Sequence, residues 1–260
     1  DGTWRIDVYA AEEGLSSSAQ ALVGDIRAAP APYPVLVGGL AASFVDQKDS
    51  LGSHLPWAIA LIAATTIIAL FVMTGSVLLP IKAVLMNLLT LGATLGILVF
   101  IFQDGRLEGL LNYDSVGALD LTQPILLGAM AFGLSTDYAV FLLSRIKEAH
   151  DAGADTSDAV ALGLQRTGRI VTAAALLFAI AIGAFATSRI TLIKELGVGT
   201  ALAVLIDATI IRALLVPSLM ALLGKWNWWA PAPLRRLHDR IGFSESAPSE
   251  SEGGAKPASA

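Results

Sequence analysis

Residues 121–144 have the sequence LTQPILLGAMAFGLSTDYAVFLLS, an apolar run of 24 residues in which Asp137 is the one charged side chain. A helix needs about 20 mostly apolar residues to cross a bilayer, so this run predicts a membrane-spanning helix. Its apolar residues follow one another instead of alternating with polar ones, which argues against a strand of a membrane β-barrel. The sequence therefore predicts a carboxylate inside a membrane span.

Four further apolar runs of this kind occur, at residues 55–73, 83–102, 170–188 and 196–224. The first three carry no charge, and the last carries Asp207 and Arg212. The chain as a whole is 55% hydrophobic and 15% charged, whereas a typical soluble domain is about 25% charged. Five such runs leave too little polar sequence to cover them in a soluble fold. The predicted fold class is therefore membrane all-α, which excludes a soluble enzyme and a disordered chain.

The composition also excludes several kinds of functional site. The chain has no cysteine, which excludes a disulfide framework, a thiolate metal site and a cysteine nucleophile. Its three histidines are scattered at positions 54, 150 and 238, which argues against a histidine metal centre. The net charge of −5 argues against nucleic-acid binding, and no Walker-type loop for ATP is present. We therefore expect no catalytic residues, no metal and no cofactor.

Residues 1–53 are predicted to be the end of a larger external α+β domain. The expected elements are a strand at 3–9, a helix at 16–28, a strand at 33–37 and a helix at 40–53. The first strand is inferred because Trp4, Ile6 and Val8 alternate with polar residues. Two strands and a helix cannot form a stable core alone, so the rest of this domain is expected upstream.

The remaining sequence divides into a transmembrane domain at 54–224 and a cytoplasmic tail at 225–260. Residues 151–169 have a helix-capping start and spaced apolar residues, which predicts an amphipathic helix lying on the cytoplasmic face. Three tryptophans within Trp226–Trp229 predict an anchor at the level of the lipid headgroups. From about residue 243 the composition predicts disorder.

The lysines and arginines predict how the chain is oriented in the membrane. Five spans place the two ends on opposite sides, with ten Lys and Arg residues on the side of the C-terminus and six on the other. Because basic residues concentrate in the cytoplasm, the C-terminus is expected there and the N-terminal segment outside. No export signal precedes the first span, so we expect a further span upstream.

Asp137 is the strongest functional signal in the sequence. An ionisable residue at this depth costs about 3 kcal/mol on insertion scales, so it needs a partner, a water-filled cavity or a proton. A carboxylate that balances burial against a nearby cation can bind and release a proton, as a proton-driven transporter requires. Tyr138 can hydrogen-bond a carboxylate on a neighbouring helix, and Gly133 allows another helix to approach. The alternative is a structural carboxylate satisfied by hydrogen bonds.

Asp207 and Arg212 form a second set of charges within a predicted span. Five residues apart on an α-helix, they are separated by about 140° around its axis, so we expect each to face a different neighbour. Arg212 lies at a depth similar to that of Asp137, which makes a contact between them one option. The other option is that Arg212 reaches the cytoplasmic interface and ties down helix ends. The role of Asp207, in proton relay or in structure, stays open.

Three weaker polar signals also lie in or beside the spans. Asn87 is expected to hydrogen-bond across helices, and Gly92 and Gly96 form a GxxxG motif that predicts close helix packing. Lys194 and Glu195, at the outer end of the last span, are expected to be solvated.

Several motifs, in order and at matching spacing, resemble the MMPL family, the mycobacterial membrane protein large transporters of the RND (resistance-nodulation-division) superfamily. They are FGLSTDYAVFLLSRI at 132–146, GLQRTGRIVTAAA at 163–175, ELGVG at 195–199, DATIIRALLVP at 207–217 and WNWWAP at 226–231. The resemblance extends over about residues 35–235. It implies two halves of six spans each, with an external domain after the first span of each half. This chain resembles the second half from within its external domain onward.

The resemblance implies a function as well as a fold. Each half of the family carries an intramembrane Asp-Tyr pair, the two pairs face each other as a proton relay, and Asp137 and Tyr138 match the second pair. From their positions within the spans, Asp207, Arg212, Gly133 and Asn87 are candidates for a role in the relay or in helix packing. The family uses the proton gradient to export lipids or other hydrophobic molecules across the bacterial plasma (inner) membrane. The expected partners are therefore the N-terminal half of the same transporter, the membrane and a hydrophobic substrate.

Two other kinds of function remain as alternatives. One is a membrane scaffold or sterol-sensing-type module that binds lipid without transport, which would have no need of a titratable Asp137. The other is a protein-export auxiliary of the same superfamily. The sequence leaves open the substrate and whether the protein forms a homo-oligomer.

Overall fold

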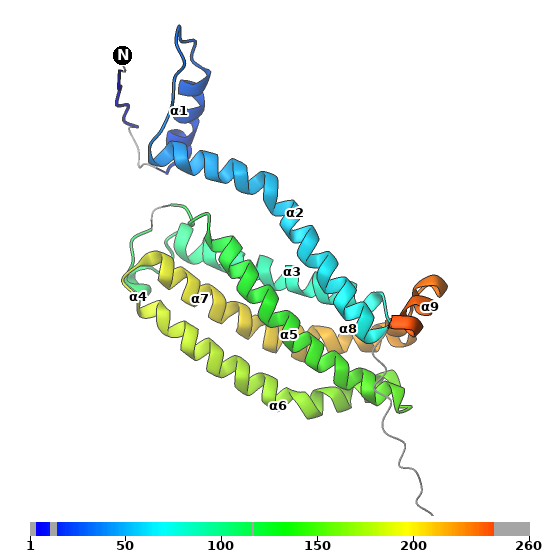
Figure 1. Cartoon of the computed structure of the whole chain (residues 1–260). Coiled ribbons are helices and arrows are strands. Elements are labelled where there is room, and N and C mark those ends of the chain that lie inside the picture. The colour runs from blue at the N-terminus through cyan, green and yellow to red at the C-terminus, as the bar shows by residue number, and fades with distance from the viewer. Residues whose placement is uncertain (1–3, 11–14, 116, 242–260) are drawn as a thin grey trace, which may run out of the picture.

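The computed structural model describes residues 4–10, 15–115 and 117–241, and this part of the chain is helical with no strand (Figure 1). Its elements are α1 (Ser17–Ala28), α2 (Leu40–Thr74), α3 (Leu78–Leu98), η1 (Val99–Gln103), α4 (Glu108–Leu111), α5 (Gln123–Asp151), α6 (Thr156–Gly183), η2 (Ala184–Thr187), α7 (Thr191–Ile206), η3 (Asp207–Leu215), α8 (Val216–Leu223), η4 (Gly224–Trp228) and α9 (Ala232–Ile241). Here η1 and η3 are π-helical, and η2 and η4 are 3₁₀-helical.

Five helical stretches are long and apolar enough to cross a membrane, which confirms the predicted number of spans. They are Leu40–Thr74, Leu78–Gln103, Gln123–Asp151, Thr156–Thr187 and Thr191–Trp228. The protein is therefore a multi-pass membrane protein. The last span is continuous in space, although η3 and η4 interrupt its α-helical geometry.

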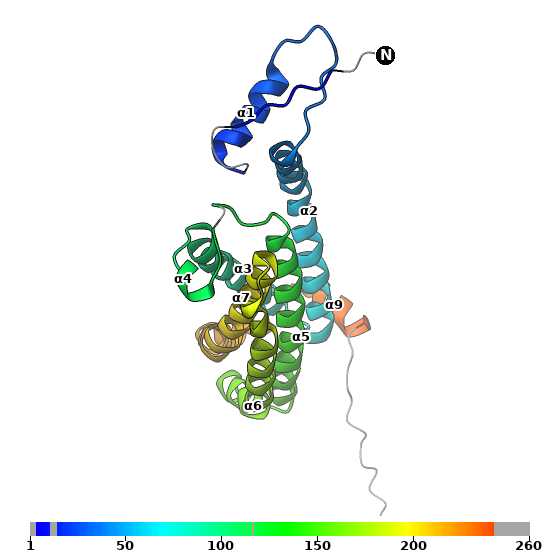
Figure 2. The same cartoon turned by 90° about the vertical axis from the view of Figure 1, so that its left-hand side faces the viewer.

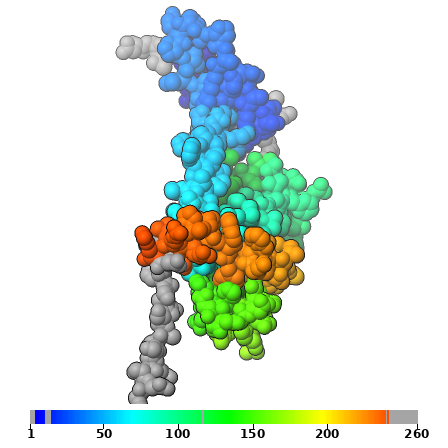
Figure 3. Space-filling view, turned by 90° about the vertical axis from the view of Figure 1, so that its right-hand side faces the viewer, coloured from blue at the N-terminus to red at the C-terminus, as the bar shows by residue number. Residues whose placement is uncertain are grey.

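The helices form a bundle from which one end of α2 projects. Helix α5 packs against α3, α6 and α7, and α7 also packs against α3 and α6. The second part of α2 packs on α3 and α5 (Figure 1). Figure 2 shows α1 and the beginning of α2 beyond the bundle, where Arg27 and Asp46 pair across the two helices. At the other end of α2, α9 lies alongside it, as Figure 3 shows, and the rings of Phe71 and His238 are 5.9 Å apart.

The two strands predicted in the N-terminal segment are not formed. Residues 4–10 and 33–37 are irregular, and neither segment makes a ladder hydrogen bond with the described chain. Trp4 and Ile6, which were expected on the apolar face of the first strand, are 91% and 84% exposed. A strand is stabilised by its neighbours in a sheet, and these two segments do not supply one another with a partner. The helix expected at 16–28 is present as α1, and Ser16 caps its first turn.

The amphipathic surface helix predicted at 151–169 is also wrong. Residues from Thr156 onward belong to α6, which runs without interruption into the fourth span. Its buried residues recur every three or four positions throughout, from Ala159 and Gly163 to Ala175 and Ala179. One stripe of buried residues therefore runs from the more polar segment at 156–169 into the apolar segment at 170–183. No proline separates the two segments.

Two apolar clusters occupy opposite ends of the bundle. The first contains Leu70, Leu79, Leu142, Leu143, Ile146, Ala149, Ala159, Val160 and Met220. The second contains Leu98, Ile101, Phe102, Tyr113, Leu127, Ala131 and Ala203. Helices α3 and α5 and the last span each contribute to both clusters, so the middle of these three spans lies between them.

The closest helix contacts occur at glycines other than those of the predicted GxxxG motif. Gly92 and Gly96 are exposed, and a Cβ at either would meet no atom of the described chain within 4 Å. A Cβ at Gly163 would instead lie 2.5 Å from Ile146 Cγ1, and one at Gly197 would lie 2.6 Å from Phe185 Cβ. The GxxxG prediction is therefore wrong for packing within the described bundle, because those glycines face outward.

We expect Gly197→Ala to destabilise the protein by about 1–3 kcal/mol, the usual range for overpacking. The added methyl group would also lie 2.9 Å from the Ile182 carbonyl oxygen, a backbone atom that cannot turn aside. Thermal unfolding of the detergent-solubilised protein measures the effect. Gly168→Ala is the matched control, because no atom lies within 4 Å of its Cβ position. An equal melting temperature for the two variants would contradict the assigned contact between α7 and η2.

Candidate functional site

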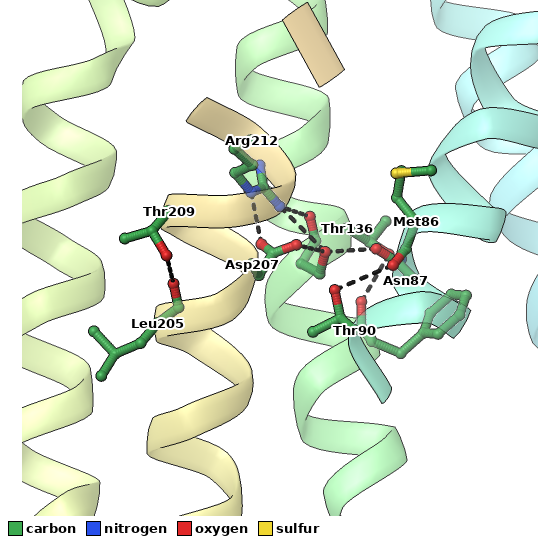
Figure 4. Close-up of polar contacts among 10 residues, drawn as sticks. Met86, Asn87, Thr90, Thr136, Leu205, Asp207, Thr209 and Arg212 are labelled. Carbon is green, nitrogen blue, oxygen red and sulfur yellow. Dashed lines mark hydrogen bonds and ion pairs between the residues drawn. The ribbon is translucent and has the colours of Figure 1, made fainter. Parts of the chain in front are cut away.

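A buried polar cluster lies between the two apolar clusters, where α3, α5 and the last span meet. Asn87 comes from α3, Ser135 from α5, and Asp207 and Arg212 from η3 in the last span. All four residues are at most 6% exposed. Polar side chains at the middle of membrane spans need partners because lipid offers none, and here they are one another's partners (Figure 4).

Asp207 and Arg212 form an ion pair, which corrects the prediction that they face different neighbours. Arg212 Nε donates to Asp207 Oδ2 at 2.6 Å. The prediction assumed α-helical geometry, but residues 207–215 are π-helical. The i→i+5 hydrogen bonds of a π-helix bring residues five apart onto one side of the helix. Such segments inside α-helices occur frequently at functional sites.

Ser135 joins the ion pair to the other two helices. Its Oγ lies 2.9 Å from Asp207 Oδ1 and 2.6 Å from Asn87 Oδ1, and 3.3 Å from Arg212 Nη2. Arg212 Nη2 also donates to the backbone carbonyl oxygen of Ser135. The carboxylate and the guanidinium are therefore both held by α5, and any movement of α5 against η3 changes their hydrogen bonds.

Tyr138 connects this cluster with the face of α5 that carries Asp137. The guanidinium carbon of Arg212 lies 5.4 Å from the centre of the Tyr138 ring, which is a cation–π contact. Asp137 itself is exposed and makes no hydrogen bond or ion pair within the described chain. Two residues apart on an α-helix, the side chains of Ser135 and Asp137 are separated by about 160° around its axis. The contact considered between Asp137 and Arg212 is therefore absent, because Arg212 pairs with Asp207.

Gly133 lies on the same open face of α5 as Asp137. Both residues are exposed, and no atom of the described chain lies within 4 Å of a Cβ placed at Gly133. The predicted close approach of another helix at Gly133 is therefore not made by any described helix of this chain.

A second polar cluster, at the far end of the bundle, was missed by the sequence reasoning. Lys194 and Glu195 were expected to be solvated but are 3% and 4% exposed. Lys194 Nζ donates to the carbonyl oxygens of Leu111 and Asn112, the latter at 2.8 Å. The C-terminal end of α4 supplies these carbonyls to the start of α7. A lysine at the end of a span gave no signal in the sequence that the end of α4, about 80 residues earlier in the chain, would cover it.

The end of the bundle near the tryptophans is held together by Asn227. Its side chain is fully buried, and its Nδ2 donates to the carbonyl oxygens of Met220 and Gly224 at 2.7 and 2.6 Å. Its Oδ1 accepts from Lys82 Nζ at 2.5 Å. These bonds link the start of α3 to the end of the last span. The neighbouring Trp226 remains 57% exposed.

We expect Asn227→Ala to destabilise the protein by about 1–3 kcal/mol, because it leaves buried donors and acceptors without partners. Thermal unfolding in detergent measures the change in stability. Lys225→Ala is the control, since this exposed side chain makes no contact that would predict more than a small effect. Equal stability of the two variants would show that Asn227 does not hold this end of the bundle.

The sequence matches the model of the MMPL family over residues 3–249. It is 48% identical to SCO6666 of Streptomyces coelicolor over 241 residues, which are 93% of this chain and 34% of that protein. It is 45% identical to the trehalose monomycolate exporter MmpL3 of Mycobacterium tuberculosis over 240 residues, 90% of this chain and 25% of the exporter. It is 39% identical over 212 residues to the heme uptake protein MmpL11 of Mycobacterium tuberculosis, covering 82% and 22% of the two chains. The chain thus spans between 22% and 34% of the length of these relatives.

Proposed function

The chain belongs to the MMPL family of RND-type transporters, and on this basis we propose that it is the C-terminal part of a proton-driven exporter of lipids or other hydrophobic molecules. The trehalose monomycolate exporter among its relatives supports this direction and substrate class. The heme uptake protein among them supports a largely apolar cargo but the opposite direction. The transporter would lie in the bacterial inner membrane, with the C-terminus of this chain in the cytoplasm.

The observation that carries the proposal is the Asp207–Arg212 ion pair at the middle of the last span. Burying two charges is expensive, and well-packed apolar residues would often serve stability equally well or better. Protonation of Asp207 would remove its charge and break the pair, leaving Arg212 to find other acceptors. Because α5 holds both partners through Ser135, this step would shift α5 against η3. A proton bound at Asp207 would in this way change the helix packing that moves substrate.

Asp137 and Tyr138 are the proposed link to the other half of the transporter. A charged residue facing lipid at mid-membrane is unfavourable by several kcal/mol, so the exposed Asp137 needs a protein or water-filled surrounding. The N-terminal half, with its own intramembrane polar residues, would cover this face of α5. Tyr138 contacts Arg212 and lies next to Asp137, so it is placed to transmit a change between the two carboxylates. A non-transporting scaffold would have no need for two such carboxylates.

Proton uptake into liposomes containing the full-length transporter tests the proposal. Asp207→Asn keeps the shape of the side chain but cannot bind a proton, so we expect uptake driven by an acidic exterior to fall by about a hundredfold or more. Asp104→Asn, in an exposed loop, makes the same chemical change outside the site and should retain uptake. Wild-type uptake by the Asp207 variant would overturn the proposed role of this pair.

A further inference from the structure

A cavity of about 50 Å³ lies beside the polar cluster, between α3, α5 and the last span. Asn87, Asp207 and Arg212 line it near the middle of their spans, and Lys82 lines it nearer the start of α3, which contacts η4 and its tryptophans. The rest of its wall is largely apolar and includes Ala83 and Ala139. The cavity therefore connects the proposed proton-binding residue with one end of the bundle.

Two buried polar atoms at the cavity have no partner in the described chain, Asn87 Nδ2 and Arg212 Nη1. The Asn87 amide could be turned over so that its nitrogen donates to Ser135 Oγ, which would free the one hydroxyl hydrogen of Ser135 for Asp207. Turning the amide exchanges the positions of its nitrogen and oxygen, so the oxygen then lacks a partner in place of the nitrogen. In either orientation, one buried amide atom of Asn87 lacks a hydrogen-bond partner that a ligand in the cavity could supply.

Water is the ligand whose chemistry fits this set of atoms. Arg212 Nη1 can only donate a hydrogen bond, and so can the two ammonium protons that Lys82 has beyond its bond to Asn227. The free amide atom of Asn87 accepts or donates according to its orientation, and Asp207 accepts. Water both donates and accepts. A cavity lined only by apolar groups stays dry, whereas polar groups at both ends supply the two to four partners that each water needs.

The size of the cavity matches a short chain of waters. Each water requires at least about 10–15 Å³ measured in this way, so the cavity has room for about three. Lys82 and Asn87 are five residues apart on α3, which corresponds to about 7.5 Å along the helix axis. About three waters at hydrogen-bonding distance from one another cover this length.

We propose that this cavity holds a chain of about three water molecules that carries protons between Asp207 and the end of the bundle at Lys82. The proton bound to Asp207 passes to the nearest water, each water passes one of its own protons onward, and the last releases a proton to the solvent. Asp207 is left as a carboxylate that pairs again with the guanidinium of Arg212. This route rests on the proposed function, because it begins at Asp207, but the presence of water does not.

The absence of cysteine from this chain allows a direct test for water. In the full-length transporter, with any cysteine elsewhere replaced, single cysteines are introduced as Ala83→Cys and Ala139→Cys in the cavity. Ala173→Cys, on the exposed outer face of α6, is the lipid-facing control. The probe is the silver ion, which is small, travels in water and reacts with the thiolate. Thiols that remain unmodified are counted after unfolding.

We expect both cavity thiols to react at least about tenfold faster than the control thiol, because a thiol in an apolar surrounding forms less thiolate. Adding Ala83→Leu to Ala139→Cys should remove this difference by filling the cavity. Two independent cavity positions keep the test valid if one variant does not fold. Reaction at the control rate at both positions would overturn the proposal.

Proton uptake separates this proposal from the proposed function. Ala139→Leu should reduce uptake at least about tenfold, and Ala173→Leu should leave it unchanged. If Asp207→Asn abolishes uptake and Ala139→Leu does not, the water chain is wrong and the function stands. If uptake survives Asp207→Asn, the proposed function fails, whatever the silver reaction shows about water.

Discussion

Replacing Asp207 by leucine should destabilise the folded protein by about 3–5 kcal/mol, the range for removing one partner of a buried ion pair. Arg212 would keep its charge at the middle of the membrane, and its Nε would lose the carboxylate that lies 2.6 Å away. Arg212→Leu should have an effect of similar size, since it leaves Asp207 buried without its cation. Unfolding of the purified protein in mixed micelles measures the free energy for both variants.

The double variant Asp207→Leu with Arg212→Leu distinguishes the loss of the ion pair from the cost of leaving one buried charge without its partner. Replacing both charges by apolar side chains removes the uncompensated charge, so most of the lost stability should return. Ser135 and Asn87 remain as polar neighbours, which prevents complete recovery. If the double variant were as unstable as the sum of the two single variants, the two residues would not be coupled, contrary to their contact in η3.

Replacing Asp137 by asparagine should reduce proton-driven transport by the full-length protein by about a hundredfold or more, the usual scale for loss of a positioned proton-transfer group. Stability should change little, because Asp137 makes no hydrogen bond or ion pair within the described chain. Transport is measured in liposomes with an imposed pH gradient, after confirming that the variant is inserted and folded.

The conservative variant Asp137→Glu is the matched control for this prediction. It keeps a carboxyl group that can bind a proton, so it should retain more transport than Asp137→Asn. Equal transport by the wild type and Asp137→Asn would show that this carboxylate has no role in proton-driven transport. The proton relay would then have to be built from Asp207 without Asp137.

The membrane fold could be predicted because lipid imposes a simple requirement on sequence. A span needs a long apolar run, and all five such runs are present as helices. The two strands failed because strand formation depends on partners that alternation alone does not identify. The surface helix at 151–169 failed because hydropathy changes at its end, whereas the packing stripe of α6 continues through it.

Three of the four members of the buried polar cluster could be predicted from the sequence, but their pairing and the fourth member, Ser135, could not. Asn87, Asp207 and Arg212 stand out because polar residues are unfavourable in membrane spans, and all three meet in one cluster. The partner of Arg212 depended on the local helix type, and a π-helical segment has no clear sequence signature. Ser135 is small and common, so nothing in the sequence distinguished it as the residue that joins three helices.

The most direct test of the central claim is proton-driven transport by the full-length protein with both Asp207→Leu and Arg212→Leu, in a preparation shown to be folded. If the ion pair couples proton binding to helix movement, this variant should insert normally and show no transport driven by the pH gradient. Transport at the wild-type rate would show that the pair is only structural and would contradict the account.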